Sequence, residues 1–490
     1  MSTEQSTEDV PLADRLRRNP RPAALWLLGL AALIALEFGA FFEFVMSLAW
    51  DVPVSWLTGA LPAGPVTAVA AALAAAGNAL ADVPTLLTRS IFENQGYYVP
   101  GTGWRSTFLD LSPATVWSLR VTLVYAYAFG FLWWLWRGYL TFRRHYRVAD
   151  WTPTDDIIDR LSRHRWGQFG LVVVVAFLVL ATFAPALSPA TFQENIRNPY
   201  GSQVEYYDEE TDSVETVTGG SANLDSKSVG ARSNVGIWSY DIYGRFHPVG
   251  TLTTGKDLMT FLAYGARVSL FIGLLASAIA GGIALLLALL TAYYKGLADL
   301  ATVVTSDAFA AMPQLLVLIM LSTVLAETWI AKIYSGAFLL AVLFGIWGWM
   351  YLWRAVRGPA FQVVENEWVD AAESFGERPT VLVRKHVAPY VIGYLLIYLS
   401  MSLGGYIIGA AGLSYLGLGV LPPTPEWGRA VAQGQSFIAT RSWHISIIPG
   451  VAITIIVLGF NALGDGIRDA IDPQSEGGEA VEAAAGGTGA

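Results

Sequence analysis

Eight apolar stretches, each near the length that crosses a lipid bilayer, constrain this chain more than any other feature of its sequence. A membrane-spanning helix needs about 20 largely apolar residues, because the hydrocarbon core is about 30 Å thick and a helix rises about 1.5 Å per residue. Only 14% of the residues are charged, whereas soluble domains carry about a quarter. The sequence therefore predicts an all-α integral membrane protein. The candidate spans are residues 23–49, 113–136, 167–187, 266–294, 309–329, 335–354, 388–410 and 445–463.

Basic residues cluster before the first candidate span, after the second, and between the sixth and the seventh. Because loops rich in Arg and Lys stay in the cytoplasm, eight crossings with both termini cytoplasmic place every cluster on that side. The clusters are Arg15, Arg17, Arg18 and Arg21, then Arg137, Arg143, Arg144 and Arg147, and finally Arg354, Arg357, Arg378, Arg384 and Lys385.

The stretch 65–83 competes as a further span. Alanine contributes little transfer energy, and Asn78 and Asp82 interrupt the run. A crossing here also forces the second basic cluster outside, against the charge rule. We therefore expect an external or surface-lying helix over these residues.

Three further segments differ in composition from the spans. Residues 1–22 and 473–490 are polar tails, the second of them acidic, with the composition of disordered chain ends. Residues 188–260 form a long polar stretch that is rich in turn residues and capable of forming strands. We expect this stretch to be a small extracytoplasmic insertion.

Several kinds of site are excluded. The chain has no cysteine, so disulfides and thiolate metal sites are absent, and its five histidines have no metal-ligand spacing. The stretch "GTLTTGKD" at 250–257 imitates a phosphate-binding loop, but Asp257 stands where that motif needs Ser or Thr. We expect no nucleotide, metal or cofactor site in this chain.

Ionisable residues inside spans are candidates for function. Glu37 and Glu43 occur in the first candidate span and Arg120 in the second. The simplest interpretation is that Glu37 pairs with Arg120 or faces a neighbouring helix. The later spans contain almost no carboxylates, whereas a proton-coupled transporter needs them in its core. The driving energy is therefore expected to come from outside the membrane.

A short charged segment, "ENEWVDAAESFG", separates the sixth and seventh candidate spans. Acidic residues near its start and Gly376 at its end predict a helix over 366–377. Ala371 and Ala372 leave a surface that another protein can approach closely. The chain then returns to the membrane near Pro389. A surface helix held by arginines explains the charges but not the small residues, so we favour a docking element.

This segment resembles the cytoplasmic coupling loop of ABC-importer permeases, whose pattern is Glu-Ala-Ala, three residues, Gly and a later Pro. Asp370, Ala371 and Ala372 match its start, and Gly376 and Pro389 match its glycine and proline. Asp370 is a shorter carboxylate than the glutamate that is usual in the family.

Four further stretches resemble the C-type permease subunit of the dipeptide/oligopeptide/nickel branch. They are "HPVGTLTTGKDLMTFLAYGARVSL" (247–270), "DAFAAMP" (307–313), "LSYLGLGVLPPTPEWG" (413–428) and "FNALGDGIRDAIDP" (460–473). The matching residues are His247, Pro248, Gly250, Thr251, Gly255, Asp257, Gly265, Arg267, Asp307, Pro313, Leu416, Gly417, Gly419, Pro422, Pro423, Trp427, Gly428 and Asp465. Leu252, Lys256 and Phe261 depart from the usual Asp, Arg and Arg, and Ala410 stands where relatives often have glutamate.

The resemblance covers about 167–473 and implies a type I ABC-importer permease fold of six family helices, preceded here by two extra N-terminal transmembrane helices. It implies a multi-pass protein of a prokaryotic cell membrane that transports peptides, nickel or related small solutes and does not hydrolyse ATP. The implied partners are a second, B-type permease subunit, two cytoplasmic ABC ATPase subunits, an extracytoplasmic solute-binding protein and membrane lipid, but no nucleic acid. The implied divisions are an N-terminal extension at 23–166, the first family helix with the insertion at 167–260, and a permease core at 261–472 with its coupling loop at 355–387.

Two other classes compete with the importer. An ion-gradient-driven secondary transporter is expected to show buried carboxylates in two inverted halves, and neither feature appears. A membrane anchor or sensor would use residues 188–260 as a ligand domain, but that stretch has no binding signature of its own. The sequence leaves open which solute is transported and what residues 1–166 do.

Overall fold

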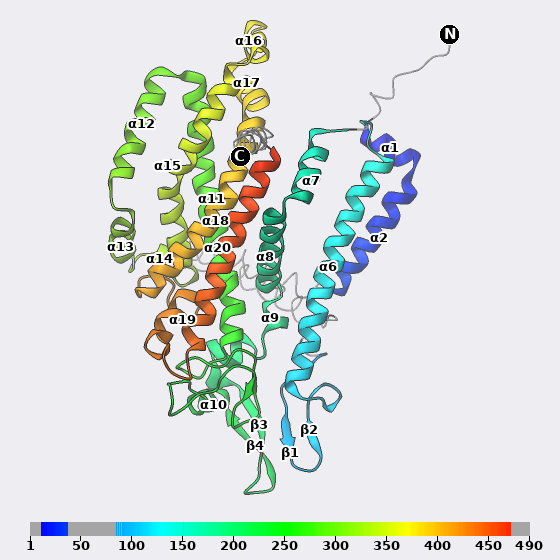
Figure 1. Cartoon of the computed structure of the whole chain (residues 1–490), viewed down its shortest axis with the longest axis vertical. Helices are drawn as coiled ribbons and strands as arrows, with labels where there is room; N and C mark the ends of the chain where they lie inside the picture. Colours follow the sequence, from blue (N-terminus) through cyan, green and yellow to red (C-terminus); the bar gives the residue numbers. More distant parts are fainter. Residues whose placement is uncertain are drawn as a thin grey trace, which may run out of the picture.

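The computed structural model describes residues 11–37, 85, 87, 89, 91–149 and 151–471, and the chain is mostly helical in these ranges (Figure 1). The α-helices are α1 Leu12–Arg18, α2 Pro20–Leu36, α6 Pro113–His145, α7 Pro153–Arg163, α8 Arg165–Thr182, α9 Ala184–Leu187, α10 Gly219–Asp225, α11 Leu258–Tyr294, α12 Gly296–Ala311, α13 Gln314–Val324, α14 Trp329–Lys332, α15 Ala337–Val364, α16 Glu367–Ser374, α17 Pro379–Leu382, α18 Ala388–Tyr415, α19 Trp427–Gly434 and α20 His444–Ile471. The strands are β1 Tyr97–Val99, β2 Gly103–Arg105, β3 Gln203–Asp208, β4 Ser213–Thr218, β5 Ser239–Tyr240 and β6 Phe246–His247. Short 3-10 or π turns occupy Phe108–Asp110, Gln193–Arg197, Pro199–Gly201, Ile333–Gly336, Val383–Val387 and Gln435–Phe437.

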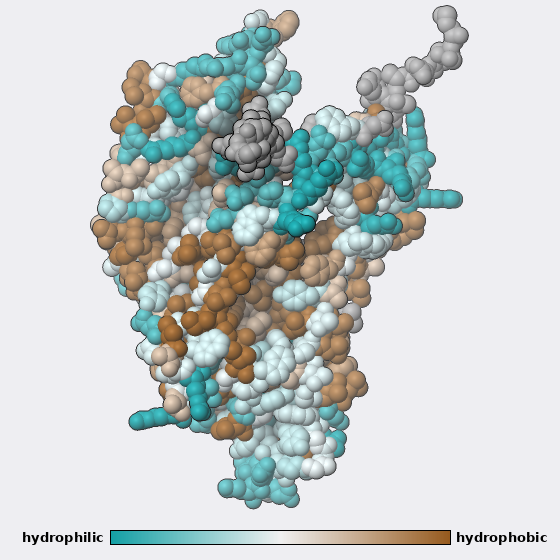
Figure 2. All heavy atoms as spheres, viewed as in Figure 1, coloured by the Kyte–Doolittle hydropathy of each residue, from teal (hydrophilic) through white to brown (hydrophobic). Residues whose placement is uncertain are grey.

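Within the described residues, 6 helical segments are long and apolar enough to cross a membrane, and the number rises to 8 if two sharply bent helix pairs each count as one span. The bent pairs are α1 with α2, at 96°, and α12 with α13, at 83°. Hydrophobic side chains gather over the middle of the bundle and hydrophilic ones over its two ends (Figure 2). The predicted all-α membrane fold is confirmed.

The fifth candidate span differs from its prediction. Instead of one helix over 309–329, α12 begins at Gly296 and α13 follows after a break at Met312 and Pro313. Proline lacks a backbone N–H and disfavours the helical conformation of the residue before it. Asp299 lies inside α12 because its carboxylate accepts a hydrogen bond from Arg357 Nε on α15 at 2.6 Å.

The first candidate span is described only in part, since α2 ends at Leu36. The remainder of residues 23–49, the stretch 65–83, and Glu43 lie outside the described residues, as do the ends of both tails.

The membrane bundle packs around α11, which lies along α15 and α18, while α20 lies between α18 and α8. Glycine allows the closest of these approaches. A Cβ atom on Gly170 of α8 would lie 2.3 Å from the backbone nitrogen of Leu463 on α20. In the stretch 404–412, a Cβ on Gly409 would lie 2.9 Å from the ring of Phe344. Small residues thus permit close helix packing at these positions.

The two ends of the bundle differ in kind (Figure 1). One end, called here the α16 end, carries α1, α16 and the last turn of α20. The opposite end, called here the sheet end, carries α10 and three two-stranded antiparallel sheets, β1 with β2, β3 with β4 and β5 with β6. Residues 188–260 thus form a folded insertion with strands at the sheet end.

Of the two arrangements predicted for Glu37, the pairing with Arg120 is not formed. Glu37 accepts a hydrogen bond from the backbone N–H of Leu87 at 2.9 Å. Arg120 instead donates to oxygen atoms near the sheet end. Its guanidinium group has five N–H donors and can therefore satisfy several acceptors at once. Its acceptors are Ala186 O at 2.5 Å, Phe92 O and Ser188 O at 2.8 Å, and Asn94 Oδ1 at 3.1 Å.

Candidate functional site

Helix α16 is the first part of the candidate site, and it projects from the end of the bundle between α15 and α17 (Figure 1). The helix predicted over 366–377 is present but shorter, at Glu367–Ser374. Gly376 follows it with a φ of 78°, a left-handed conformation that glycine adopts without strain. The N–H of Gly376 donates to Glu373 O at 2.8 Å. This bond ends the helix and turns the chain back to the membrane.

The exposed face of α16 differs from the expected one. Ala371 is exposed, but Ala372 is half-buried and packs against the main hydrophobic cluster of the bundle. The two alanines therefore do not form one free surface. The side chain that protrudes furthest is Phe375, which is 92% exposed. The sequence analysis did not single out Phe375, although an aromatic residue directly before the glycine that ends a polar loop helix indicates an exposed contact residue.

Contacts with both neighbouring membrane helices hold α16 in place. Val369 is buried beneath it, and the ring of Trp368 lies 5.4 Å from that of Tyr390 on α18. Glu377 and His386 approach to 2.9 Å between Oε2 and Nε2. A force applied to α16 therefore reaches α15 and α18 directly.

Much of the segment 355–387, predicted as a cytoplasmic loop, is helical. Helix α15 continues to Val364, and α17 begins at Pro379 and leads through a π turn into α18. Pro389 lies within the first turn of α18, where its missing N–H costs no helical hydrogen bond. Residues 365–378 therefore separate α15 from α17, and α16 lies between them.

Asp307 and Pro313 of the "DAFAAMP" stretch both belong to the bent pair. Asp307 forms an ion pair with Arg354, and Arg354 Nε also donates to Ser306 Oγ at 2.8 Å. These contacts tie α12 to α15, the helix that leads directly into α16. Pro313 lies at the bend between α12 and α13.

At the sheet end, the structure brings together residues from two of the motif stretches. Trp427 is buried, and its Nε1 donates to Leu262 O on α11 at 2.8 Å. A Cβ on Gly265 of α11 would lie 2.6 Å from the Trp427 ring. Similarly, a Cβ on Gly428 would lie 1.8 Å from Ala411 O on α18. These residues therefore fix α19 against α11 and α18.

The middle of the loop 413–428 is partly exposed. Leu416 is half-exposed, Gly417 has a φ of 79°, and the peptide between Pro422 and Pro423 is cis. A Cβ on Gly419 would lie 1.9 Å from Ser414 Oγ, so the loop turns back closely on α18. A cavity of about 380 Å³ adjoins it, lined in part by Tyr415, Arg429 and Gln433.

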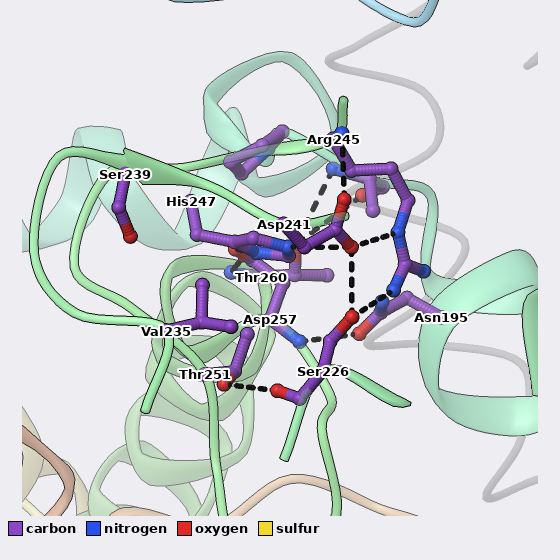
Figure 3. A network of polar contacts seen from close by, with 12 residues as sticks. Asn195, Ser226, Val235, Ser239, Asp241, Arg245, His247, Thr251, Asp257 and Thr260 are labelled. Carbon is purple, nitrogen blue, oxygen red and sulfur yellow. Dashed lines mark hydrogen bonds and ion pairs between the residues drawn. The ribbon is translucent and has the colours of Figure 1, made fainter. Parts of the chain in front are cut away.

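The stretch 247–257 forms a buried polar network that holds the start of α11 (Figure 3). His247 Nδ1 lies 2.8 Å from Asp257 Oδ2, and its Nε2 lies 3.4 Å from Asp241 Oδ2. Asp257 Oδ1 accepts a hydrogen bond from the N–H of Thr260 at 2.6 Å, which caps α11. Lys256 Nζ donates to Ile196 O at 3.0 Å. The polar groups that imitate a phosphate loop thus serve the insertion itself.

Charge in this network is balanced within it. Burial lowers the pKa of His247, but the carboxylates of Asp241 and Asp257 outweigh burial and leave it raised. Burial raises the pKa of Asp241, yet the hydrogen bond from His247 and the charge of Arg245 hold it well below its usual range. The raised pKa favours the protonated imidazole of His247 beside Asp241 and Asp257.

Other motif residues also have structural roles. A Cβ on Gly255, whose φ is 76°, would lie 1.6 Å from Asn223 O. Arg267 donates from Nε to Ala181 O at 2.7 Å and so caps the end of α8. Pro248, Gly250 and Thr251 precede Gly255 in the same stretch 247–257. Pro248 and Gly250 are buried, and Thr251 shares a hydrogen bond with Ser228. Asp465 is half-buried near the end of α20.

Comparison with known proteins agrees with this geometry. Residues 283–476 match the family described as "Binding-protein-dependent transport system inner membrane component". Residues 152–202 match "N-terminal TM domain of oligopeptide transport permease C". Neither match includes residues 1–151.

Three relatives illustrate the similarity. The dipeptide transport system permease protein DppC of Alkalihalophilus pseudofirmus is 27% identical over 66% of this chain and 90% of its own length. The oligopeptide transport system permease protein OppC of Bacillus subtilis is 28% identical over 65% of this chain and 89% of its own. The glutathione transport system permease protein GsiD of Pectobacterium atrosepticum is 33% identical over 46% of this chain and 73% of its own.

A bundle of apolar spans with a short protruding helix between two of them is the architecture of a multi-pass membrane protein. The chain belongs to the family of inner-membrane components of binding-protein-dependent transport systems. It is the transmembrane permease component of an ABC importer and is not catalytic, because ATP hydrolysis belongs to separate subunits. The family assignment does not favour the ion-gradient-driven alternative.

Proposed function

We propose that α16 is the coupling helix of this importer and docks on a cytoplasmic ATPase subunit. The observation that carries the proposal is the exposed pair of Ala371 and Phe375 at the tip of the α16 end. A small residue beside a protruding aromatic ring suits a partner cleft, since aromatic anchors supply much of the energy of interfaces. Because α16 is fixed to α15 and α18, closure of the ATPases would move these two helices.

Docking of α16 on an ATPase also sets the orientation of the chain in the membrane, and with it the sides on which the other partners lie. The α16 end faces the cytoplasm with two ATPase subunits, and the sheet end faces a solute-binding protein outside. A second permease subunit completes the translocation path. The printed names of relatives mention dipeptides, oligopeptides and glutathione, which supports a peptide or a related small solute as the cargo. The loop 413–428 lies beside the entrance to the path.

Substitutions at the exposed face test the docking. Phe375→Ala removes the anchor, and Ala371→Glu adds bulk and charge to the contact. Losing such an anchor typically costs 2 kcal/mol or more of binding, so affinity for the ATPase subunits should fall by about thirtyfold. Uptake and solute-stimulated ATP hydrolysis should fall with it in the reconstituted importer.

Tyr200→Ala is a matched control, because this side chain is 62% exposed at the opposite end of the bundle. It should leave ATPase affinity unchanged. If Phe375→Ala and Ala371→Glu both kept normal ATPase binding and normal stimulated hydrolysis, α16 would be an ordinary surface turn.

Orientation has a separate test, since the native chain contains no cysteine. A cysteine introduced at Ser213 on β4 should react with an impermeant thiol reagent added outside the cell. A cysteine at Ser374 on α16 should react only after the membrane is opened. Labelling of the Ser213 variant only from the cytoplasmic side would reverse the proposed topology.

A further inference from the structure

The turn between α11 and α12 carries three large apolar side chains that face solvent, called here the turn patch. Tyr294 ends α11, and Leu297 and Leu300 lie near the start of α12; the three are 64%, 84% and 57% exposed. Leu297 and Leu300 are three positions apart, so they share one face of the helix. Figure 2 shows hydrophobic side chains over the end of α12 that lies toward α16.

Helix lengths place the turn patch beyond the span of α8. Arg267 on α11 donates to Ala181 O at 2.7 Å and to Thr182 O at 3.0 Å, so this part of α11 is level with the end of α8. From there α11 runs about 40 Å to Tyr294, whereas α8 runs back only about 25 Å to Arg165. The turn therefore lies roughly 15 Å beyond the start of α8, nearer to the α16 end (Figure 1).

The start of α8 marks the membrane boundary at this end of the bundle. Arg163 and Arg165 flank this start, and Trp166 follows with its side chain partly exposed. Basic and aromatic residues at the end of an apolar helix lie in the headgroup region. That region is about 5–8 Å deep on each side of the hydrocarbon core. Lipid therefore does not reach Tyr294 or Leu297.

The turn patch adjoins the beginning of α16. Lys295 follows Tyr294, and its Nζ lies 3.5 Å from Oε1 of Glu365, which directly precedes the N-cap residue of α16. Asp299 on α12 accepts a hydrogen bond from Arg357 Nε on α15 at 2.6 Å. These contacts fix the turn against the helix that leads into α16. The turn patch and α16 are therefore neighbouring surfaces at the same end of the chain.

We propose that the turn patch is a second docking surface for the ATPase subunit that binds α16, an inference that rests on the proposed coupling role of α16. A contiguous apolar surface outside the membrane marks a site that another protein covers. Continuity with α16 assigns this cover to the same ATPase subunit. Because α15 contacts α12 and leads into α16, a subunit that grips both elements moves α15 from two points.

Photo-crosslinking in the reconstituted importer identifies the cover of the turn patch. Benzoylphenylalanine replaces Leu297 in one variant and Phe375 in another, and mass spectrometry identifies the crosslinked molecule. Both positions should crosslink to the ATPase subunit. A crosslink to the ATPase from position 375, with only lipid or the second permease captured from position 297, would overturn this proposal and leave coupling by α16 intact. Absence of an ATPase crosslink from both positions would overturn both proposals.

Affinity measurements test the energetic contribution of the same surface. Leu297→Ser and Leu300→Ser together should weaken binding of the ATPase subunits by about thirtyfold, the loss that is typical of an interface hot spot. Leu109→Ser with Ile242→Ser is the matched control, because these two side chains are 75% and 73% exposed at the sheet end. The control should keep normal affinity. Thermal unfolding temperatures of both double variants should match that of the native chain, since all four side chains are exposed.

Two results of the affinity measurements would also overturn the proposal. A loss below threefold in the Leu297 and Leu300 variant would show that the turn patch stays uncovered in the assembled importer. An equal loss in the control would show that the effect does not depend on the position of the apolar side chains.

Discussion

Replacing Arg120 with methionine should weaken the attachment of the N-terminal extension to the permease core. Arg120 is completely buried in α6, and its guanidinium group donates to backbone carbonyls from two separate segments. Ala186 and Ser188 belong to the segment that matches the permease family, whereas Phe92 belongs to the extension. Methionine keeps an unbranched apolar side chain but removes every donor.

The magnitude follows from the acceptors left behind. A buried carbonyl that loses its partner costs about 1–3 kcal/mol, and bonds to a charged donor are the stronger ones. The structure shows 4 acceptors around this side chain. Some acceptors will find water once the contact opens, and burying the guanidinium group has its own cost. We therefore expect a net loss of about 4 kcal/mol, well below the sum of the separate bonds.

Hydrogen exchange of backbone amides measures this loss locally. Since 1.4 kcal/mol corresponds to a tenfold change, exchange in residues 91–96 and 184–190 should accelerate by roughly a thousandfold. Exchange in α11 and α15 should stay unchanged. Arg105→Met is the matched control, because Arg105 pairs with Asp110 while both side chains are about half exposed.

Two results would refute the reasoning. An acceleration below tenfold near Arg120 would show that its hydrogen bonds contribute little to joining the two parts. A comparable acceleration throughout α11 and α15 would show that the extension and the core unfold together.

Three further predictions concern other segments. Gly376→Val forces a left-handed φ on a branched residue, at a cost of about 1–2 kcal/mol, although the added Cβ atom has no neighbour within 4 Å. Uptake and stimulated ATP hydrolysis should fall while the thermal unfolding temperature stays nearly constant. Lys256→Ala loses one hydrogen bond to Ile196 O, so ATP hydrolysis by the assembled importer should stay near normal, and loss of nucleotide binding would contradict our interpretation of residues 250–257. The pKa of His247 is raised above its ordinary value of 6.5, so its pairing with Asp241 and Asp257 stabilises the fold fully below pH 6.5 and loses that contribution as pH rises through the raised pKa. His247→Gln should therefore lower the unfolding temperature most at acidic to neutral pH. A loss of unfolding temperature that grows at alkaline pH would contradict this sign.

Much of the membrane fold could be predicted because apolar length is a strong local signal. The stretches 113–136 and 445–463 lie inside α6 and α20. The bent pair α12 and α13 could not be predicted this way. Asp299 lies in the first turn of α12 and pairs with Arg357 on α15, a contact between positions far apart in the sequence that no local pattern indicates.

The candidate site was predictable where local chemistry decided it. Acidic residues, alanines and Gly376 indicate a short helix and its end, and both are present. Which residues of that helix are free depends on tertiary packing, and periodicity alone did not separate Ala371 from Ala372. The contact of Gly265 with Trp427 joins positions far apart in sequence, so no local pattern predicted it.

The same kind of contact, a buried arginine that donates to backbone carbonyls, joins the N-terminal extension to the permease core. Arg267 on α11 caps the carbonyls at the end of α8, and Arg120 on α6 caps those at the end of α9. Helix ends leave backbone carbonyls without partners, and a buried arginine satisfies several of them without needing a carboxylate nearby. An added helix that brings such an arginine can therefore attach to carbonyls already present in the core, and the packing of α11, α15 and α18 need not change. This attachment lies at the sheet end, so the helix ends at the α16 end stay free for the contacts proposed there.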